Sequence, residues 1–205
     1  MNLSPGEAWG DVEVLPANAP VVVSDAELVA CIGPDIGVTT ATDLPIVGLA
    51  GGDLCASLGG RGDVADRRGA PTTVVTIDVA SVSTDAGDHV FAAHLFARGW
   101  FWAGEGVAVM NAERCSSWLV APRAHPGDGL LDVVQGRLSV RDRLLARQRL
   151  RTGDHLPHPA LAVRRTARLD LEFDRPRRVV VDGIAHGTSQ RLLIEVLPNA
   201  VRVAV

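Results

Sequence analysis

The sequence predicts an α+β fold, in which a small α/β unit packs on a larger antiparallel β-sandwich that carries one inserted helix. Over residues 12–60, short apolar runs alternate with helix-start signals, which is typical of parallel strands joined by helices. From residue 71 onward, short β-type runs follow one another at the spacing typical of a sandwich or barrel. We therefore divide the chain into a first unit over 1–62 and a sandwich over 71–205.

The first unit is predicted from two apolar runs, each followed by a helix start. Ser24 or Asp25 can cap the first helix, because a short side-chain oxygen accepts hydrogen bonds from the free amides of a first turn. Gly51-Gly52-Asp53 opens the second helix. The predicted elements, in order, are a strand over 20–23, a helix over 26–32, a strand over 45–49, a helix over 54–58 and a polar, glycine-rich linker over 60–71.

The sandwich is predicted from the alternation of apolar and polar residues. Leu169, Leu171 and Phe173 alternate with acidic residues, as in a half-buried antiparallel strand. The predicted strands lie over 72–79, 89–97, 106–111, 130–134, 169–173, 179–182, 191–196 and 200–205.

One helix is predicted within the sandwich, over 140–150, with Ser139 as its cap. We expect Leu144 and Leu145 to face inward and the arginines to face outward. An arginine face of this kind is usually a solvated surface, but it can also contact phosphate or anionic lipid headgroups. The arginines in question are Arg123, Arg141, Arg143, Arg147, Arg149 and Arg151.

Composition excludes several classes of function. The chain has 205 residues, of which 47% are hydrophobic and 21% charged, as in an ordinary globular protein. All 20 basic residues are arginine, which excludes a lysine-dependent P-loop and a Schiff-base lysine. The net charge of -4 argues against binding nucleic acid through bulk charge. No apolar run reaches the ~18 residues of a membrane helix, and Cys31, Cys55 and Cys115 look like free thiols, so we expect a cytoplasmic protein.

Two turns and one aromatic run are candidate binding features. Asp128-Gly129 can hold a hard cation between backbone carbonyls, or can be a plain hairpin turn. Gly51-Gly52-Asp53 can bind an anion at a helix start, although Asp53 would repel it, or can be a tight strand-to-helix turn. Trp100, Phe101 and Trp102 either line an apolar ligand groove or fill the core or a dimer face. His94, on an apolar run, is expected to be a core or pocket histidine rather than a ligand.

Several spaced motifs occur in a fixed order over residues 87–205. They are APRAHPGDGLLDVV, then a helix, TGDHLPHP, an alternating strand, VVVDGIA and LPNAVRVAV. In this order they resemble the C-terminal half of the bacterial diacylglycerol kinase and sphingosine kinase-like lipid kinases. The segment VGLAGGDLCASLG, at Val47–Gly59, resembles the one that closes the family's nucleotide-binding domain, with Ala50 and Gly52 in place of its Thr and Asn.

The resemblance implies an ATP-dependent lipid kinase of two domains, the second a lipid-binding β-sandwich. A structural magnesium would be held by the Asp128 side chain and by the carbonyls of His125 and Leu130. The aspartate that deprotonates the lipid hydroxyl would be Asp182. ATP would lie near Asp25, Gly51, Gly52 and Asp53.

The departures from the family pattern concern the phosphate-binding apparatus. The front of the kinase domain has no counterpart, so the first unit is a truncated one, and Val22–Glu27 replaces the family's G-G-D-G-T loop without any glycine. Ile184 replaces the glutamate of the family's D-G-E motif. Phosphoryl transfer depends on positioning and charge neutralisation, so these losses argue against it. We therefore carry two hypotheses: a magnesium- and ATP-dependent lipid kinase, or an inactive member that binds a lipid, a nucleotide or a protein. For either we expect a lipid or small amphiphilic ligand, peripheral membrane contact, and a homodimer or a partner chain.

Overall fold

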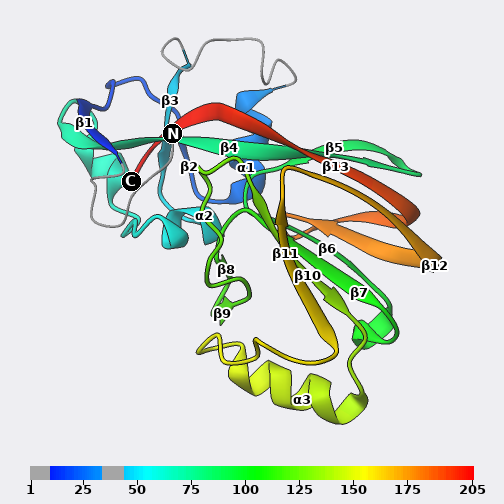
Figure 1. Cartoon of the computed structure of the whole chain (residues 1–205). Coiled ribbons are helices and arrows are strands. Elements are labelled where there is room, and N and C mark those ends of the chain that lie inside the picture. Colours follow the sequence, from blue (N-terminus) through cyan, green and yellow to red (C-terminus); the bar gives the residue numbers. More distant parts are fainter. Residues whose placement is uncertain (1–9, 34–43) are drawn as a thin grey trace.

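The computed structural model describes residues 10–33 and 44–205, and most of its strands belong to one mixed sheet (Figure 1). Within these residues, the strands are β1 (Asp11–Val14), β2 (Val21–Val22), β3 (Ile46–Leu49), β4 (Pro71–Thr84), β5 (Gly87–Phe91), β6 (His94–Arg98), β7 (Gly106–Met110), β8 (Arg114–Cys115), β9 (Trp118–Leu119), β10 (Leu131–Gly136), β11 (Leu161–Thr166), β12 (Arg168–Val181) and β13 (Ile184–Ala204). The α-helices are α1 (Asp25–Ile32), α2 (Gly52–Ser57) and α3 (Val140–Arg149), and 3-10 turns lie at Val64–Arg67 and Trp100–Trp102 (η3).

The β-sandwich forms because its long strands pair with different neighbours along their length. β12 pairs with β13 from its beginning, as in Leu169 with Ile194, to its end, and only its end also pairs with β6, as in Val180 with Phe96. Irregular register within β12 bends the strand between these two pairings. Apolar side chains from both parts, such as Phe91 and Phe173, are fully buried between them. The predicted α+β class with a large antiparallel sandwich is thus confirmed.

The small α/β unit is joined to the sandwich through its strands and its core. β2 pairs in parallel with β3, which pairs in parallel with the end of β13, so the closing strand returns to the first unit (Figure 1). Leu28 of α1 and Leu54 of α2 share one buried cluster with Ile77 and Val203 of the long strands. Because the core is shared, burial of the small unit depends on the sandwich. The predicted domain boundaries, with the first unit ending at residue 62 and the sandwich beginning at residue 71, stay a prediction.

Several local predictions are corrected. The run 89–97 is two strands, because the chain turns at Ala92-Ala93, and 179–182 is not a separate strand because β12 continues into it. The linker over 60–71 contains a 3-10 turn whose Val64 is fully buried. β1, β8, β9 and β11 were missed because they are short or polar.

The orientation predicted for the inserted helix is wrong. α3 begins after Ser139, whose hydroxyl accepts a hydrogen bond from the amide of Asp142 at 3.1 Å, as expected. Leu144 and Leu145, however, are 63% and 39% exposed. α3 lies at the end of the molecule (Figure 1), and none of its residues is fully buried. In the described part of the chain, no helix is long and apolar enough to cross a membrane.

Candidate functional site

Asp182, the predicted catalytic base, occupies the tight turn between β12 and β13. Asp182 and Gly183 both have positive φ, 43° and 84°, which is the backbone of a two-residue hairpin of the Asp-Gly type. Its carboxylate reaches across to the connection between β5 and β6. One oxygen accepts the amide of Ala92 at 2.7 Å, and the other accepts those of Ala93 and His94 at 3.0 and 2.9 Å. Both oxygens of Asp182 therefore hold backbone in place.

Asp25 performs a similar task at the start of α2. Its carboxylate is buried and accepts the amides of Asp53 at 2.8 Å and Leu54 at 3.1 Å. The residue preceding α2, Gly51, has no side chain to cap it, so Asp25 supplies the cap from a distant part of the sequence. Gly52 has φ of 93°, and a Cβ there would collide with the Asp25 carboxylate. Asp25 thus takes two of the amides that a phosphate would need.

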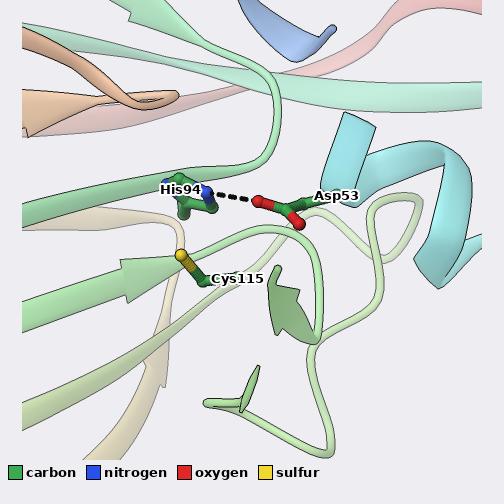
Figure 2. A group of neighbouring side chains, drawn as sticks. All are labelled: Asp53, His94 and Cys115. Carbon is green, nitrogen blue, oxygen red and sulfur yellow. Dashed lines mark hydrogen bonds and ion pairs between the residues drawn. The ribbon is translucent and has the colours of Figure 1, made fainter. Parts of the chain in front are cut away.

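Asp53, His94 and Cys115 converge from three separate elements (Figure 2). Asp53 comes from the first turn of α2, His94 begins β6, and Cys115 ends β8. Nε2 of His94 lies 2.9 Å from Oδ2 of Asp53, and the other oxygen of Asp53 accepts the amide of Ser116 at 2.5 Å. His94 is only 3% exposed, so the prediction of a pocket histidine fits its position. We call these three residues the Asp-His-Cys cluster.

The buried setting changes the proton affinity of these groups. Burial raises the pKa of Asp25 to about 6, although its two backbone hydrogen bonds oppose the shift. Burial also raises the pKa of Asp182. Burial alone would lower the pKa of His94, but the hydrogen bond to Asp53 and the nearby Cys115 and Asp182 raise it to about 10. His94 is therefore expected to be an imidazolium paired with Asp53 at neutral pH.

An arginine of β11 contacts the aspartates at the predicted magnesium loop. Oδ2 of Asp128 forms an ion pair with Arg165, whose Nε also lies 3.1 Å from Oδ2 of the buried Asp132. The other oxygen of Asp128 accepts the amide of Leu130 at 3.0 Å. His125 lies in the same loop, where its Nδ1 accepts the amide of Gly127 at 3.2 Å. A guanidinium already neutralises this acidic pair, which argues against a magnesium ion at Asp128. The site predicted from Asp128 and the carbonyls of His125 and Leu130 stays a prediction.

An exposed apolar and basic surface is formed by η3 and α3. Trp100 and Phe101, in η3, are 73% and 75% exposed. The Phe101 carbonyl accepts a hydrogen bond from Arg143 at 2.7 Å, which joins η3 to α3. Exposed apolar side chains of α3 include Val140 and Leu144. We call η3 and α3 together the α3–η3 surface.

A cavity of about 800 Å³ opens between α3 and the β8–β9 hairpin. Leu144, Arg147 and Arg151 line it from the helix side, and Trp118 lines it from the hairpin. The Arg147 guanidinium lies over the Trp118 ring, 5.6 Å from its centroid. The cavity therefore combines apolar walls with two cationic side chains.

Comparison with known proteins agrees with this architecture. Residues 98–205 match the family model described as the YegS C-terminal NAD kinase beta sandwich-like domain. This match covers more than half of the chain. The chain belongs to that family. No curated protein matches the sequence significantly.

Solved structures with a similar fold include bacterial diacylglycerol kinases. One similar structure is a diacylglycerol kinase from Bacillus anthracis str. Sterne, with a TM-score of 0.53 and 14% identity over 78% of this chain and 66% of that chain. A candidate diacylglycerol kinase from the same organism gives a TM-score of 0.55 at 14% identity, over 78% of this chain and 68% of the other. At this identity the likeness shows the fold alone. The family model over residues 98–205, together with this shared fold, bears out the predicted lipid kinase-like family.

Sequence reasoning located some site residues and missed others. Asp25, Gly52, Asp53 and Asp182 do lie around the junction of the two units, and Asp25 directly caps the helix of Asp53. The nucleotide-binding and catalytic roles assigned to them stay predictions. The contributions of His94, Cys115 and Arg165 were missed. The only available signals were a histidine in an apolar run and two adjacent arginines, Arg164 and Arg165, and neither signal identifies the partner residue.

Proposed function

We propose that this chain is a non-catalytic member of the lipid kinase-like family that binds an anionic lipid surface through its α3–η3 surface. The observation that carries the proposal is the exposure of aromatic and aliphatic side chains beside a cluster of arginines. Over residues 137–151 there are six arginines and one acidic residue, Asp142, although the whole chain is net acidic. Such a combination suits an interface where apolar groups enter the headgroup region and arginines meet phosphate.

The backbone of η3 supports this role. Phe101 and Trp102 have φ of 48° and 60°, a conformation that bulky residues rarely adopt. Each such residue costs on the order of 1–3 kcal/mol. Trp102 offsets part of its cost by packing edge-on against Phe96, with ring centroids 5.7 Å apart, whereas the ring of Phe101 is 75% exposed and gains little burial within the chain. A strained turn that presents aromatic rings to solvent is expected where those rings contact a partner.

The buried junction supports the absence of phosphoryl transfer. Asp182 accepts three backbone amides, Asp25 caps α2, and Asp53 pairs with His94. A nucleotide phosphate placed at α2 would meet the carboxylates of Asp25 and Asp53 rather than free amides. Loss of one positioned donor typically costs a hundredfold in rate, and this chain lacks the whole glycine loop. These residues support the fold instead.

Vesicle sedimentation tests the lipid-binding proposal. The full chain should bind vesicles that contain phosphatidylglycerol and should bind phosphatidylcholine vesicles much less. Each arginine near an anionic surface contributes about 1 kcal/mol, so Arg147→Gln with Arg151→Gln should weaken partitioning roughly thirtyfold. Arg61→Gln, an exposed arginine of the first unit, is the matched control. Equal binding by all variants, or equal binding to both vesicles, would contradict the proposal.

A separate assay tests the kinase alternative. Mg-ATP is added in a thermal-shift measurement, and transfer of labelled phosphate to diacylglycerol is followed in mixed micelles. The proposal expects neither a shift nor transfer. Transfer that is abolished by Asp182→Asn in a folded variant would establish the kinase instead.

A further inference from the structure

The Asp-His-Cys cluster has the donor atoms and the convergence of a transition-metal site. A carboxylate oxygen, an imidazole nitrogen and a thiol sulfur all lie within 4.8 Å of one another. Figure 2 shows that the three side chains approach one point from three directions. We propose that Asp53, His94 and Cys115 bind one Zn2+ ion, with a fourth position left for water or another ligand. This proposal does not rest on lipid binding.

The pair of His94 and Asp53 needs only a small separation to accept zinc. Bonds of about 2.0–2.3 Å in a tetrahedron place neighbouring donor atoms roughly 3.3–3.6 Å apart. Nε2 of His94 and Oδ2 of Asp53 are 2.9 Å apart because they share a proton. Replacing that proton by the ion requires the two side chains to separate by a few tenths of an ångström.

The donor set favours zinc over the hard cations. Mg2+ and Ca2+ prefer oxygen ligands alone, whereas zinc takes thiolate, imidazole and carboxylate together. Binding converts the Cys115 thiol to a thiolate and leaves Nε2 of His94 unprotonated. The thiol proton and the proton between His94 and Asp53 pass to solvent.

The surroundings hold the ligands as a metal site requires. His94 is buried, with its ring 5.0 Å from that of Phe96, and its backbone amide is fixed by Asp182. The second oxygen of Asp53 accepts the amide of Ser116, so the hairpin that carries Cys115 also orients Asp53. Cys115 lines the 800 Å³ cavity beside α3. An ion therefore has a route of entry, and it would fasten α2 to the sandwich.

Metal binding by the full chain tests the proposal. The protein is stripped with EDTA, and Co2+ is added as a spectroscopic probe. We expect saturation at one ion per chain, with a thiolate-to-cobalt charge-transfer band and the visible bands of tetrahedral cobalt. Zn2+ should displace the cobalt and should show submicromolar affinity in competition with a chromogenic chelator. Absence of the charge-transfer band, or binding no tighter than to an unfolded control, would overturn the proposal.

Matched cysteine variants identify the ligand. Cys115→Ser should weaken Zn2+ binding roughly a hundredfold or more and remove the charge-transfer band, whereas Cys31→Ser, at an exposed cysteine of α1, should change neither. His94→Gln should also weaken binding. Equal loss in the Cys31 and Cys115 variants would refute the assignment.

Alkylation of the unmodified protein gives an answer that does not depend on folding of a variant. Iodoacetamide labelling is followed peptide by peptide in the presence and absence of Zn2+. Zinc should slow the labelling of Cys115 at least about tenfold and leave the rate at Cys31 unchanged. Equal rates at Cys115 with and without zinc would count against the site.

Discussion

The junction of the two units and the α3–η3 surface use charged and polar side chains in opposite ways. At the junction, the carboxylates of Asp25 and Asp182 are surrounded by backbone amides of other elements. On the α3–η3 surface, arginines and aromatic rings stand in solvent. Groups that already have buried partners stabilise the fold, while exposed apolar and cationic groups remain available for a partner. In this chain, the residues at the family's catalytic positions also hold backbone in place, and for this reason we propose that binding lies elsewhere.

The largest effect should come from Asp182. Asp182→Ala removes the acceptor of three amides, two of them in the fully buried residues Ala92 and Ala93. We expect the free energy of unfolding to fall by about 4 kcal/mol, because unpaired buried amides cost 1–3 kcal/mol each. Urea denaturation measures the change. Asp170→Ala, at an exposed aspartate of β12, should change stability little; if the two variants were equal, the junction would not be structural.

The next effect concerns pH and Asp25. Its pKa in the folded chain is about 6, above the ordinary value of 3.8. Between these values the folded state holds a proton that the unfolded state has lost, so this group favours folding most below pH 4. Its contribution to the free energy of unfolding should fall by about 3 kcal/mol in total as the pH rises from 4 to 6, and should stay constant above pH 6.

The comparison of wild type with Asp25→Asn isolates this effect. Chemical denaturation is measured in EDTA from pH 4 to pH 8. The difference in unfolding free energy between the two proteins should vary with pH over 4–6 and be flat above. A difference that is flat throughout would show that Asp25 is not held in a desolvating site.

A smaller effect is expected at Arg165. Arg165→Gln leaves the buried Asp132 without its cation, and we expect a loss of about 2 kcal/mol, less than for a fully buried pair because Arg165 is partly exposed. Magnesium should not shift the melting temperature of the wild type. A rise with Mg2+ that Asp128→Asn abolishes would show that the loop prefers the metal.

The smallest change in stability is expected at Leu144. Leu144→Ser removes an exposed side chain, so the unfolding free energy should change by less than about 0.5 kcal/mol. Binding to phosphatidylglycerol vesicles should nevertheless weaken by about 1–2 kcal/mol, because a leucine side chain no longer enters the bilayer. Strong destabilisation by this substitution, or unchanged vesicle binding, would show that Leu144 does not serve lipid binding, and the α3–η3 surface would then not differ from the junction in this respect.

Local sequence determined the elements that depend on neighbouring residues. Ser24 caps α1, with its hydroxyl accepting the amide of Glu27 at 3.2 Å, because the capping bond spans only three residues. The apolar run before it forms β2, and alternation correctly placed the first part of β12. The ordered motifs also predicted the lipid kinase-like family, because an ordered series of motifs identifies a family more specifically than any single segment does.

Only the tertiary structure decided which distant side chains meet. Asp53 and His94 are 41 residues apart, and Asp128 and Arg165 are 37 apart, so no local pattern pairs them. The exposure of Leu144 and Leu145 could not be predicted from the sequence either. Helical periodicity identifies the apolar face of a helix but does not show whether another element packs on it. The sequence thus determined the order and type of most elements through short-range hydrogen bonding and apolar periodicity. Folding alone decided which carboxylates are capped by amides, which are paired with cations, and which apolar face is left to solvent, because these depend on contacts between segments far apart in the chain.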